Sequence, residues 1–173
     1  MKEIMINDNQ LTEEDIEKEV IRVKALMINS KGKILVAHNN NTYQFPGGHI
    51  EENESFEKCL IREIKEETGI TIEELDRPFL CITTYAKNYF DTGKNIKSKI
   101  YYYVVYTDEE PNYGETHYDE LELSSDFNLY YVNIKDLEDL LQKGIEDGIM
   151  DQNIAREISY VMREYEEKYG EKE

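Results

Sequence analysis

The stretch from Ser55 to Gly69 constrains the fold more than any other part of this chain, because it predicts one helix with both ends marked. Phe56, Leu60 and Ile64 recur every four residues, the spacing that places apolar side chains on one face of a helix. Gly69 follows the last periodic turn, where a C-terminal glycine cap belongs. A single helix is therefore expected here, with an apolar face that packs on another element.

The polar side of this helix carries a cluster of acids. Glu63, Glu66 and Glu67 are three or four positions apart, so their carboxylates gather over the last two turns. Each like-charged pair costs about 0.2–0.5 kcal/mol, and the helix dipole disfavours negative charge at this end. Mg²⁺ or Mn²⁺ would relieve the conflict, because hard divalent cations prefer carboxylate and carbonyl oxygens. Arg62 could hold the cluster in place by pairing with Glu54 or Glu66.

An acidic helix can also be an ordinary solvated surface, but the residues before it make a larger pattern. Phe45-Pro46-Gly47-Gly48 has the composition of a loop in which backbone approaches closely. From Gly48 the chain runs through five residues to Glu54, then seven more to Arg62-Glu63-Ile64-x-Glu66-Glu67-x-Gly69-Ile70. This pattern resembles the Nudix box at every defining position, and the layout from about Val20 to Leu141 is also similar to that of the family.

The resemblance implies an α+β class with the Nudix fold, an α/β/α sandwich around a mixed β-sheet. It also implies an enzyme, a pyrophosphohydrolase that depends on Mg²⁺ or Mn²⁺. Such a Nudix hydrolase would cleave the phosphoanhydride bond of a nucleoside diphosphate linked to another moiety, by water attack assisted by the box glutamates.

The resemblance also assigns roles to residues of the box. Glu63, Glu66, Glu67 and Arg62 would be catalytic, with Arg62 orienting the carboxylates. The three glutamates and the carbonyl oxygen of Gly48 would bind the metal, although Glu63 could instead be the base that deprotonates the attacking water. Two further residues would mainly support the geometry, namely Glu54 and Gly69.

Other candidates lie outside the box. Many family members place one more acid in a later loop, and Glu120 and Glu122 are the candidates here, although both could be solvated loop acids. A nucleobase could stack on Tyr43, Tyr85 or Tyr89, although most tyrosines in strand-like runs are expected in the core.

The rest of the chain alternates strand-like and helical patterns. Strands are predicted at 21–28, 34–37, 79–85, 98–106 and 129–132, the first two as a hairpin. Helices are predicted from Thr12 to about Glu19, from Asn133 or Asp136 to Lys143, and over 149–168. Polar stretches at 88–97 and 108–126 predict loops.

This organisation predicts one Nudix hydrolase domain over 1–173. It has a core at about 20–141, an N-terminal extension at 1–19 that starts with an edge strand or a poorly ordered end, and a C-terminal helix at about 149–168. That helix carries an apolar stripe that could pack on its own sheet or on a partner in a homodimer, and own-core packing is favoured. The stripe consists of Ile154, Ile158, Val161 and Met162.

Composition limits the partners. The net charge of −18 repels polyanions, so a small phosphorylated nucleotide-like substrate is expected and a nucleic-acid polymer is not. No run is apolar enough for a membrane span, and no signal peptide is recognisable. Cys59 and Cys81 are expected to be reduced and buried, and a cytoplasmic location is the default.

Three alternatives share the fold or the box. A binding domain without catalysis would be expected to lack a box carboxylate, an mRNA cap hydrolase would need basic surface, and an isoprenoid diphosphate isomerase departs from the standard box. The secondary marks of Nudix subfamilies do not select a substrate. Tyr85 stands where the ADP-ribose type tends to have proline.

Overall fold

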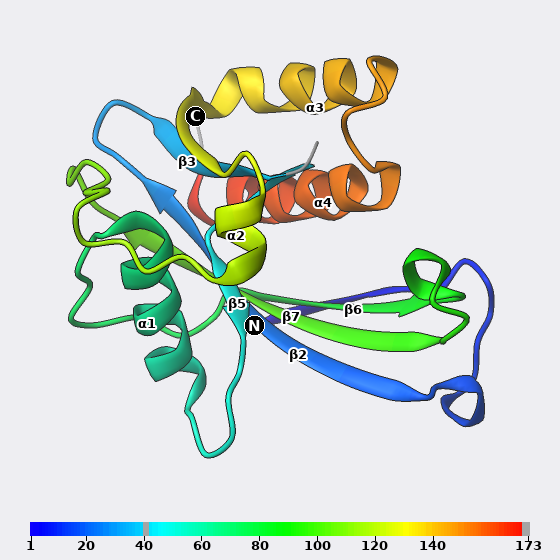
Figure 1. The fold of residues 1–173 in the computed structure, drawn as a ribbon. Coiled ribbons are helices and arrows are strands. Elements are labelled where there is room, and N and C mark those ends of the chain that lie inside the picture. The colour runs from blue at the N-terminus through cyan, green and yellow to red at the C-terminus, as the bar shows by residue number, and fades with distance from the viewer. Residues whose placement is uncertain (40–41, 171–173) are drawn as a thin grey trace.

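The computed structural model describes residues 1–39 and 42–170, and within these ranges eight strands form one mixed sheet with four α-helices around it (Figure 1). The strands are β1 (Lys2–Ile6), β2 (Lys18–Ile28), β3 (Lys33–Asn39), β4 (Thr42–Gln44), β5 (Gly47–His49), β6 (Leu80–Ala86), β7 (Ile96–Tyr106) and β8 (Asn128–Asn133). The helices are α1 (Phe56–Thr68), α2 (Glu120–Ser124), α3 (Leu137–Glu146) and α4 (Gln152–Tyr169). Three single 3₁₀ turns occupy Glu13–Asp15, Tyr89–Asp91 and Ile134–Asp136.

The centre of the sheet is the parallel pair of β2 and β7. Their register runs without interruption from Lys18 opposite Ile96 to Ile28 opposite Tyr106. The strand order is β1-β6-β7-β2-β3-β4, with β5 paired to β2 and β8 paired to β3. Because β5 pairs antiparallel with the middle of β2, the sheet splits there and leaves room beside the two strands.

Alternation along β2 creates a core on each face of the sheet. Leu26 and Ile28 belong to the cluster under α3 and α4, whereas Val23, Ala25 and Met27 belong to the cluster under α1. Figure 1 shows α1 and the α3–α4 pair on opposite sides of the sheet. The α/β/α sandwich around a mixed sheet, predicted from the sequence, is therefore confirmed.

Several element boundaries differ from the sequence prediction. The prediction of a helix from Thr12 to about Glu19 is wrong. This segment contains only the 3₁₀ turn, and β2 already begins at Lys18. The predicted hairpin is reduced to one bridge, Ile28 to Ile34, since most of β3 pairs with β8.

The loops predicted at Pro46–Gly48 and within 108–126 also need correction. Gly47 and Gly48 belong to β5, where hydrogen bonding to β2 outweighs their low strand preference. The acidic stretch contains α2, which Asp119 caps. The C-terminal helix starts three residues later than predicted, after its cap Asp151.

The apolar stripe of α4 packs on its own sheet, as favoured by the sequence. Ile158, Val161 and Met162 are buried in the same cluster as strand residues of β2 and β7, and Ile154 packs against it. At the other end of the chain, β1 pairs parallel with β6 and forms the edge strand. Within the described ranges, no helix is long and apolar enough to cross a bilayer. The one-domain prediction includes residues 40, 41 and 171–173, which lie outside these ranges.

Candidate active site

The glycines of β5 bring backbone and helix unusually close. A side chain on Gly47 would place its Cβ 2.1 Å from the carbonyl oxygen of Val23 on β2, and Gly47 has a φ of 140°. A Cβ on Gly48 would lie 2.4 Å from the carboxyl carbon of Glu63 on α1. Only glycine fits at position 47, whereas a side chain at position 48 would displace the carboxylate of Glu63. The predicted metal-ligating residue Gly48 thus lies on the strand next to the glutamates of α1.

Helix α1 forms with the ends that the sequence predicted. The Ser55 hydroxyl accepts a hydrogen bond from the amide of Lys58 at 3.2 Å, and Gly69 ends the helix with a φ of 72°. Cys59, Leu60 and Ile64 are buried against the sheet. This packing turns the opposite, acidic side of the last turns toward β5 and the sheet edge.

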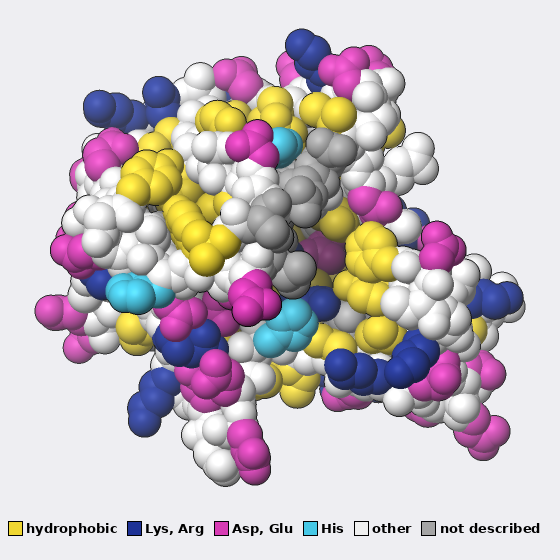
Figure 2. All heavy atoms as spheres, in the orientation of Figure 1, with side chains coloured by type: hydrophobic (Ala, Val, Ile, Leu, Met, Phe, Trp, Pro, Cys, Tyr) yellow, Lys and Arg dark blue, Asp and Glu magenta, His cyan; other side chains and the backbone are white. Residues whose placement is uncertain are grey.

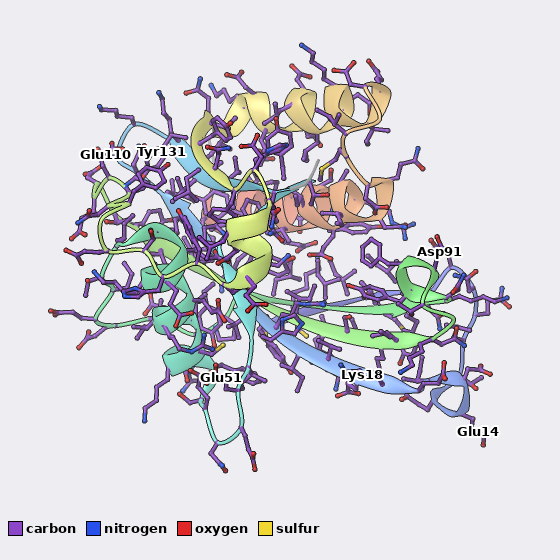
Figure 3. All side chains as sticks on the ribbon, in the orientation of Figure 1. Glu14, Lys18, Glu51, Asp91, Glu110 and Tyr131 are labelled. Carbon is purple, nitrogen blue, oxygen red and sulfur yellow. The ribbon has the colours of Figure 1, made fainter. Side chains whose placement is uncertain are left out.

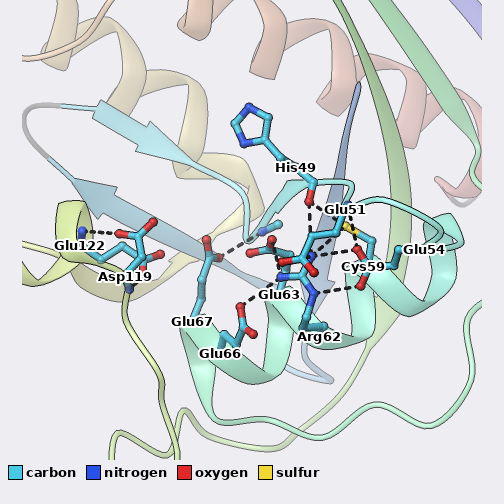
Figure 4. Close-up of polar contacts among 11 residues, drawn as sticks. His49, Glu51, Glu54, Cys59, Arg62, Glu63, Glu66, Glu67, Asp119 and Glu122 are labelled. Carbon is cyan, nitrogen blue, oxygen red and sulfur yellow. Dashed lines mark hydrogen bonds and ion pairs between the residues drawn. The ribbon is translucent and has the colours of Figure 1, made fainter. Parts of the chain in front are cut away.

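Arg62 is the centre of a charge network (Figure 4). Its Nε and Nη2 each lie 2.9 Å from a carboxylate oxygen of Glu54. Its Nη1 donates to Glu63 at 2.9 Å and to Glu66 at 3.2 Å. The guanidinium thus contacts both partners that the sequence suggested and a third carboxylate, and it lowers the pKa of Glu54 to about 2.

Glu67 is the most deeply placed of the glutamates. Its carboxylate accepts a hydrogen bond from the amide of Gly47 at 3.0 Å, and the residue is only 6% exposed. Burial raises the pKa of Glu67, and the nearby carboxylates of Glu122 and Glu63 add to the effect. The pKa of Glu63 is also raised, first by burial and then by Glu66 and Glu122, against the opposing effect of Arg62.

This donor set suits a divalent cation chemically. The carboxylates of Glu63, Glu66, Glu67 and Glu122 line one cleft, and their mutual repulsion is the cost that a bound cation removes. Within residues 1–39 and 42–170, however, no three Asp, Glu, His or Cys side chains are already arranged to hold a metal. The hydrogen bonds explain this, because Arg62 draws Glu63 and Glu66 aside while Glu67 turns to the amide of Gly47.

Helix α2 brings one of the two predicted loop acids to this cluster. Glu122 lines the same cleft as Glu63, Glu66 and Glu67, whereas Glu120 is exposed and is not part of its wall. Asp119 and Glu122 form a reciprocal capping box, with N–H to carboxylate distances of 2.8 and 2.7 Å. Asp119 also lines the cleft, and the Asp-x-x-Glu spacing was the sequence signal that could have revealed this helix.

The cleft extends from these acids across the sheet and has a volume of about 1030 Å³. Figure 2 shows the hollowed centre of this face, with acidic, basic and histidine side chains along it. Figure 3 labels two of its lining residues, Glu51 in the loop before α1 and Asp91 on the β6–β7 connection. The acid cluster therefore forms only one end of a larger binding space.

The tyrosines proposed for stacking divide into two groups. Tyr85 and Tyr89 line the cleft, and the Tyr85 hydroxyl donates to Glu13 at 2.6 Å. Tyr43 is not among the described residues that form its wall, and its ring lies 4.8 Å from that of His38 and packs against the core.

Several charged residues of the cleft could not be found from the sequence, because no motif marks them. Arg22, Lys24 and Glu157 are among them. Lys24 Nζ lies 3.7 Å from a carboxylate oxygen of Glu157, and the buried hydroxyl of Tyr102 donates to the same oxygen. Strand β2 and helix α4, distant in sequence, thus supply a polar wall on the far side from α1.

Comparison with known proteins gives short matches to curated relatives. This chain is 43% identical over 42 residues to a putative 8-oxo-dGTP diphosphatase of Bacillus subtilis, which is 24% of this chain and 27% of that protein. It is 40% identical over 55 residues to an RNA pyrophosphohydrolase of Pasteurella multocida, 31% of this chain and 28% of that protein. The matches thus span less than a third of these two relatives.

Solved structures match over more of the chain. The MutT protein of Methanosarcina mazei Go1 aligns with a TM-score of 0.51 and 22% identity, over 70% of this chain and 83% of that one. A MutT NUDIX hydrolase of Burkholderia pseudomallei aligns with a TM-score of 0.52 and 18% identity, over 69% and 86%. At these identities the likeness establishes the fold.

The family model described as the NUDIX domain matches residues 18–152. This range contains β2 to β8, α1 to α3 and the whole acid cluster, and it agrees with the box read from Gly48 to Ile70. The chain belongs to the NUDIX family.

Proposed function

We propose that this protein is a pyrophosphohydrolase that requires Mg²⁺ or Mn²⁺ and acts on a nucleoside diphosphate linked to another moiety. The observation that carries the proposal is that Glu63, Glu66 and Glu67 of α1 line the same cleft as Gly48, and that this cleft, of about 1030 Å³, is large enough for a nucleotide. A solvated acidic face would not bury Glu67 to 6% exposure or fix it to the amide of Gly47.

In this proposal Glu63, Glu66, Glu67 and the carbonyl oxygen of Gly48 hold the metal. When bound, a divalent ion lowers the pKa of a ligated water and neutralises charge on the phosphate oxygens. Glu63 and Glu66 leave Arg62 to serve as ligands, and Arg62 remains a positioning residue anchored by Glu54.

The reaction itself is an attack of water on phosphorus. A carboxylate accepts the proton of the attacking water, the new P–O bond forms, and the bridging P–O bond breaks with its electron pair leaving on the second phosphate. Glu63 is one candidate for the base. Glu122 is the other, because α2 places it on the cleft near the box, and Glu120 is a weaker candidate because it does not line the cleft.

The substrate class rests on the chemistry of the cleft. Tyr85 and Tyr89 supply aromatic surface at the end remote from α1, which suits a nucleobase better than a bare phosphate chain. The names of the curated relatives point to 8-oxo-dGTP and to RNA ends, but those matches are too short to carry a substrate to this chain. The net charge of −18 favours a small substrate over a polymer.

A hydrolysis panel with the purified protein tests the proposal. The panel holds nucleoside triphosphates, ADP-ribose, nucleotide sugars, dinucleoside polyphosphates and NADH, each with Mg²⁺, Mn²⁺ or EDTA. Metal-dependent turnover of one member is expected, with a loss of about 100-fold or more in Glu67→Gln. Glu57→Gln is the matched control, because Glu57 is an exposed acid of the same helix outside the cleft.

Two results would contradict the proposal. Turnover unchanged by EDTA would show that the reaction needs no metal. Equal activity in Glu67→Gln and wild type would show that this box glutamate is not required for catalysis. Binding of a panel member without its hydrolysis would favour the alternative of a ligand-binding domain.

We further infer that the chain works as one cytoplasmic Nudix domain over 1–173. The free, buried thiols of Cys59 and Cys81 support a reducing compartment. The edge strand β1 and helix α4 join the same sheet and core as the box, which supports one domain. Homodimer formation remains a prediction that light scattering would test.

A further inference from the structure

Arg22 lines the cleft but belongs neither to the proposed metal site nor to the candidate bases. It lies on β2, opposite His49 of β5 and Ile100 of β7, and it is half-buried in the floor of the cleft. His49 directly follows Gly48, so Arg22 is adjacent to the strand that carries the predicted metal-ligating carbonyl.

Among residues 1–39 and 42–170, the three hydrogen bonds of the Arg22 guanidinium all go to uncharged groups. Its Nε donates to His49 Nε2 at 3.0 Å, and an imidazole nitrogen that accepts carries no proton. Its Nη1 donates to the hydroxyl of Ser98 at 3.3 Å, and its Nη2 to the hydroxyl of Tyr89 at 3.4 Å. In the part of the chain that the structure describes, Arg22 forms no ion pair with an Asp or Glu carboxylate.

Three of the other four cations that line the cleft are compensated, and the fourth, Lys87, is an exposed residue of the β6–β7 connection that forms no ion pair among the described residues. Lys24 faces Glu157, Arg62 faces Glu54, and Arg156 lies 2.7 Å from Asp8. The chain has 38 acidic and only 20 basic residues, so a carboxylate partner is the ordinary outcome for an arginine here. A half-buried guanidinium whose hydrogen-bond acceptors are all neutral retains its positive charge for an anion that enters the cleft.

The surroundings of Arg22 indicate how it is held. Tyr89 lies in a turn in which Asn88, Phe90 and Asp91 all have positive φ, at 48°, 44° and 58°. Asn and Asp tolerate this conformation, but a bulky residue such as Phe90 rarely adopts it. The turn brings the Tyr89 hydroxyl to Arg22 and closes the end of the cleft remote from α1.

We propose that Arg22 binds the phosphate group of the substrate that is not attacked by water, while the glutamates of α1 act on its neighbour. This assignment rests on the proposed function, because it names the phosphate-binding residue of the same site. A guanidinium can donate two parallel hydrogen bonds to a phosphate, and it would do so with the Nη groups that now contact Ser98 and Tyr89.

The same chemistry could hold the phosphate chain of a substrate or an inorganic phosphate product. Calorimetric titrations in EDTA therefore use three probes, which are tripolyphosphate, pyrophosphate and ADP. The wild type is expected to bind tripolyphosphate and ADP, and Arg22→Met to bind both at least 10-fold more weakly. Arg22→Lys, which keeps the charge and loses the fork, is expected to fall between them.

Arg163→Met is the matched control, because Arg163 is an exposed arginine of α4 outside the cleft and its removal changes the net charge equally. Thermal melts establish that each variant is folded, and Arg22→Lys serves if Arg22→Met is not. On a hydrolysed substrate, Arg22→Met is expected to raise KM about 10-fold with kcat within about 2-fold of wild type.

Three results would overturn the proposal. The wild type could fail to bind any probe in EDTA, Arg22→Met could bind as tightly as wild type, or Arg163→Met could weaken binding equally. Binding of pyrophosphate but not ADP would also overturn it, because the site would then hold a product. None of these titrations needs turnover. A protein that binds the probes but hydrolyses nothing would therefore contradict the proposed activity and still support the role of Arg22.

Discussion

Gly47 and Gly48 are neighbours in β5, yet a side chain at each would meet a different obstacle. At Gly47 the obstacle is rigid, since the added Cβ would lie 2.1 Å from a backbone oxygen of β2. At Gly48 the obstacle is the carboxyl end of Glu63, which can rotate away. Gly47 is therefore needed for β5 to pair with β2, and Gly48 is needed to leave room for the carboxylate of Glu63.

We expect the two alanine variants to separate accordingly. Gly47→Ala should lower the free energy of unfolding by about 2–3 kcal/mol, because β5 must leave β2. Gly48→Ala should unfold much more like wild type but lose about 100-fold in turnover, because Glu63 is displaced. Denaturant titration and steady-state kinetics on the active panel member measure both. Equal loss of stability in the two variants would contradict this distinction.

Glu54 provides a prediction on pH. Arg62 lowers the pKa of Glu54 to about 2, below the ordinary value of about 4.3. Because the folded state binds the proton less readily, the stabilisation is complete above the ordinary pKa and is lost as the pH falls toward about 2. The difference in unfolding free energy between wild type and Glu54→Gln should thus be constant above about pH 5 and shrink below it.

Glu52→Gln is the control for this series, since Glu52 is an exposed acid of the same loop. The stability of Glu52→Gln should differ little from that of wild type. If the difference for Glu54→Gln grew on acidification, the pairing with Arg62 would not be the cause.

At the scale of elements, α2 decides which loop acid reaches the site. The helix places Glu122 on the cleft and Glu120 toward solvent, although only one residue separates them. Glu122→Gln keeps an oxygen that can accept the amide of Asp119, so the cap should survive while the charge is lost. We expect kcat to fall about 100-fold or more in Glu122→Gln and to change less than 2-fold in Glu120→Gln. Similar kcat values in the two variants would exclude Glu122 as the base.

The elements differ in how well the sequence predicts them. Helix α1 was predictable because its apolar period, its cap and its final glycine are all local signals. Helix α2 carries a local signal too, its capping box, but it is short and lies in a stretch whose composition suggests a loop. Strand β5 carries none, because two glycines form a strand only when β2 supplies the hydrogen bonds.

At the scale of the whole molecule, Glu157 joins α4 to the sheet. Its carboxylate accepts from Tyr102 of β7 and lies 3.7 Å from Lys24 of β2, and both side chains of this ion pair are 11% exposed. Glu157→Gln should keep the bond from Tyr102 but leave Lys24 without its counter-charge. We expect a loss of about 3 kcal/mol and a fall in Tm of roughly 6–12 °C.

The control is Glu167→Gln, on the same helix, whose side chain is 59% exposed. It should change the stability by less than about 0.5 kcal/mol. Differential scanning calorimetry measures both variants, and equal Tm values would show that the ion pair contributes nothing to the docking of α4.

The cleft as a whole could not be predicted from the sequence. The box predicted the acids of one wall, but the rest of the cleft combines Arg22 and Lys24 of β2 with Glu157 of α4. Each of these residues is unremarkable in its own segment, and only the packing of α4 over the sheet brings them together. Local patterns identify the reacting end of such a site better than the end that selects the substrate.

The uninterrupted parallel pairing of β2 and β7 also affects the order in which the protein can fold. The two strands are separated in the chain by β3 to β6 and by α1, so their pairing must wait until all of these have been synthesised. Bringing two strands together over such a separation costs loop-closure entropy before any stabilising contact forms between them. This cost slows folding. On the ribosome α1 would emerge before β7, the central partner of β2. The segment of the box helix is therefore synthesised first, and the sheet on which its apolar face packs is completed only after β7 and β8 have followed.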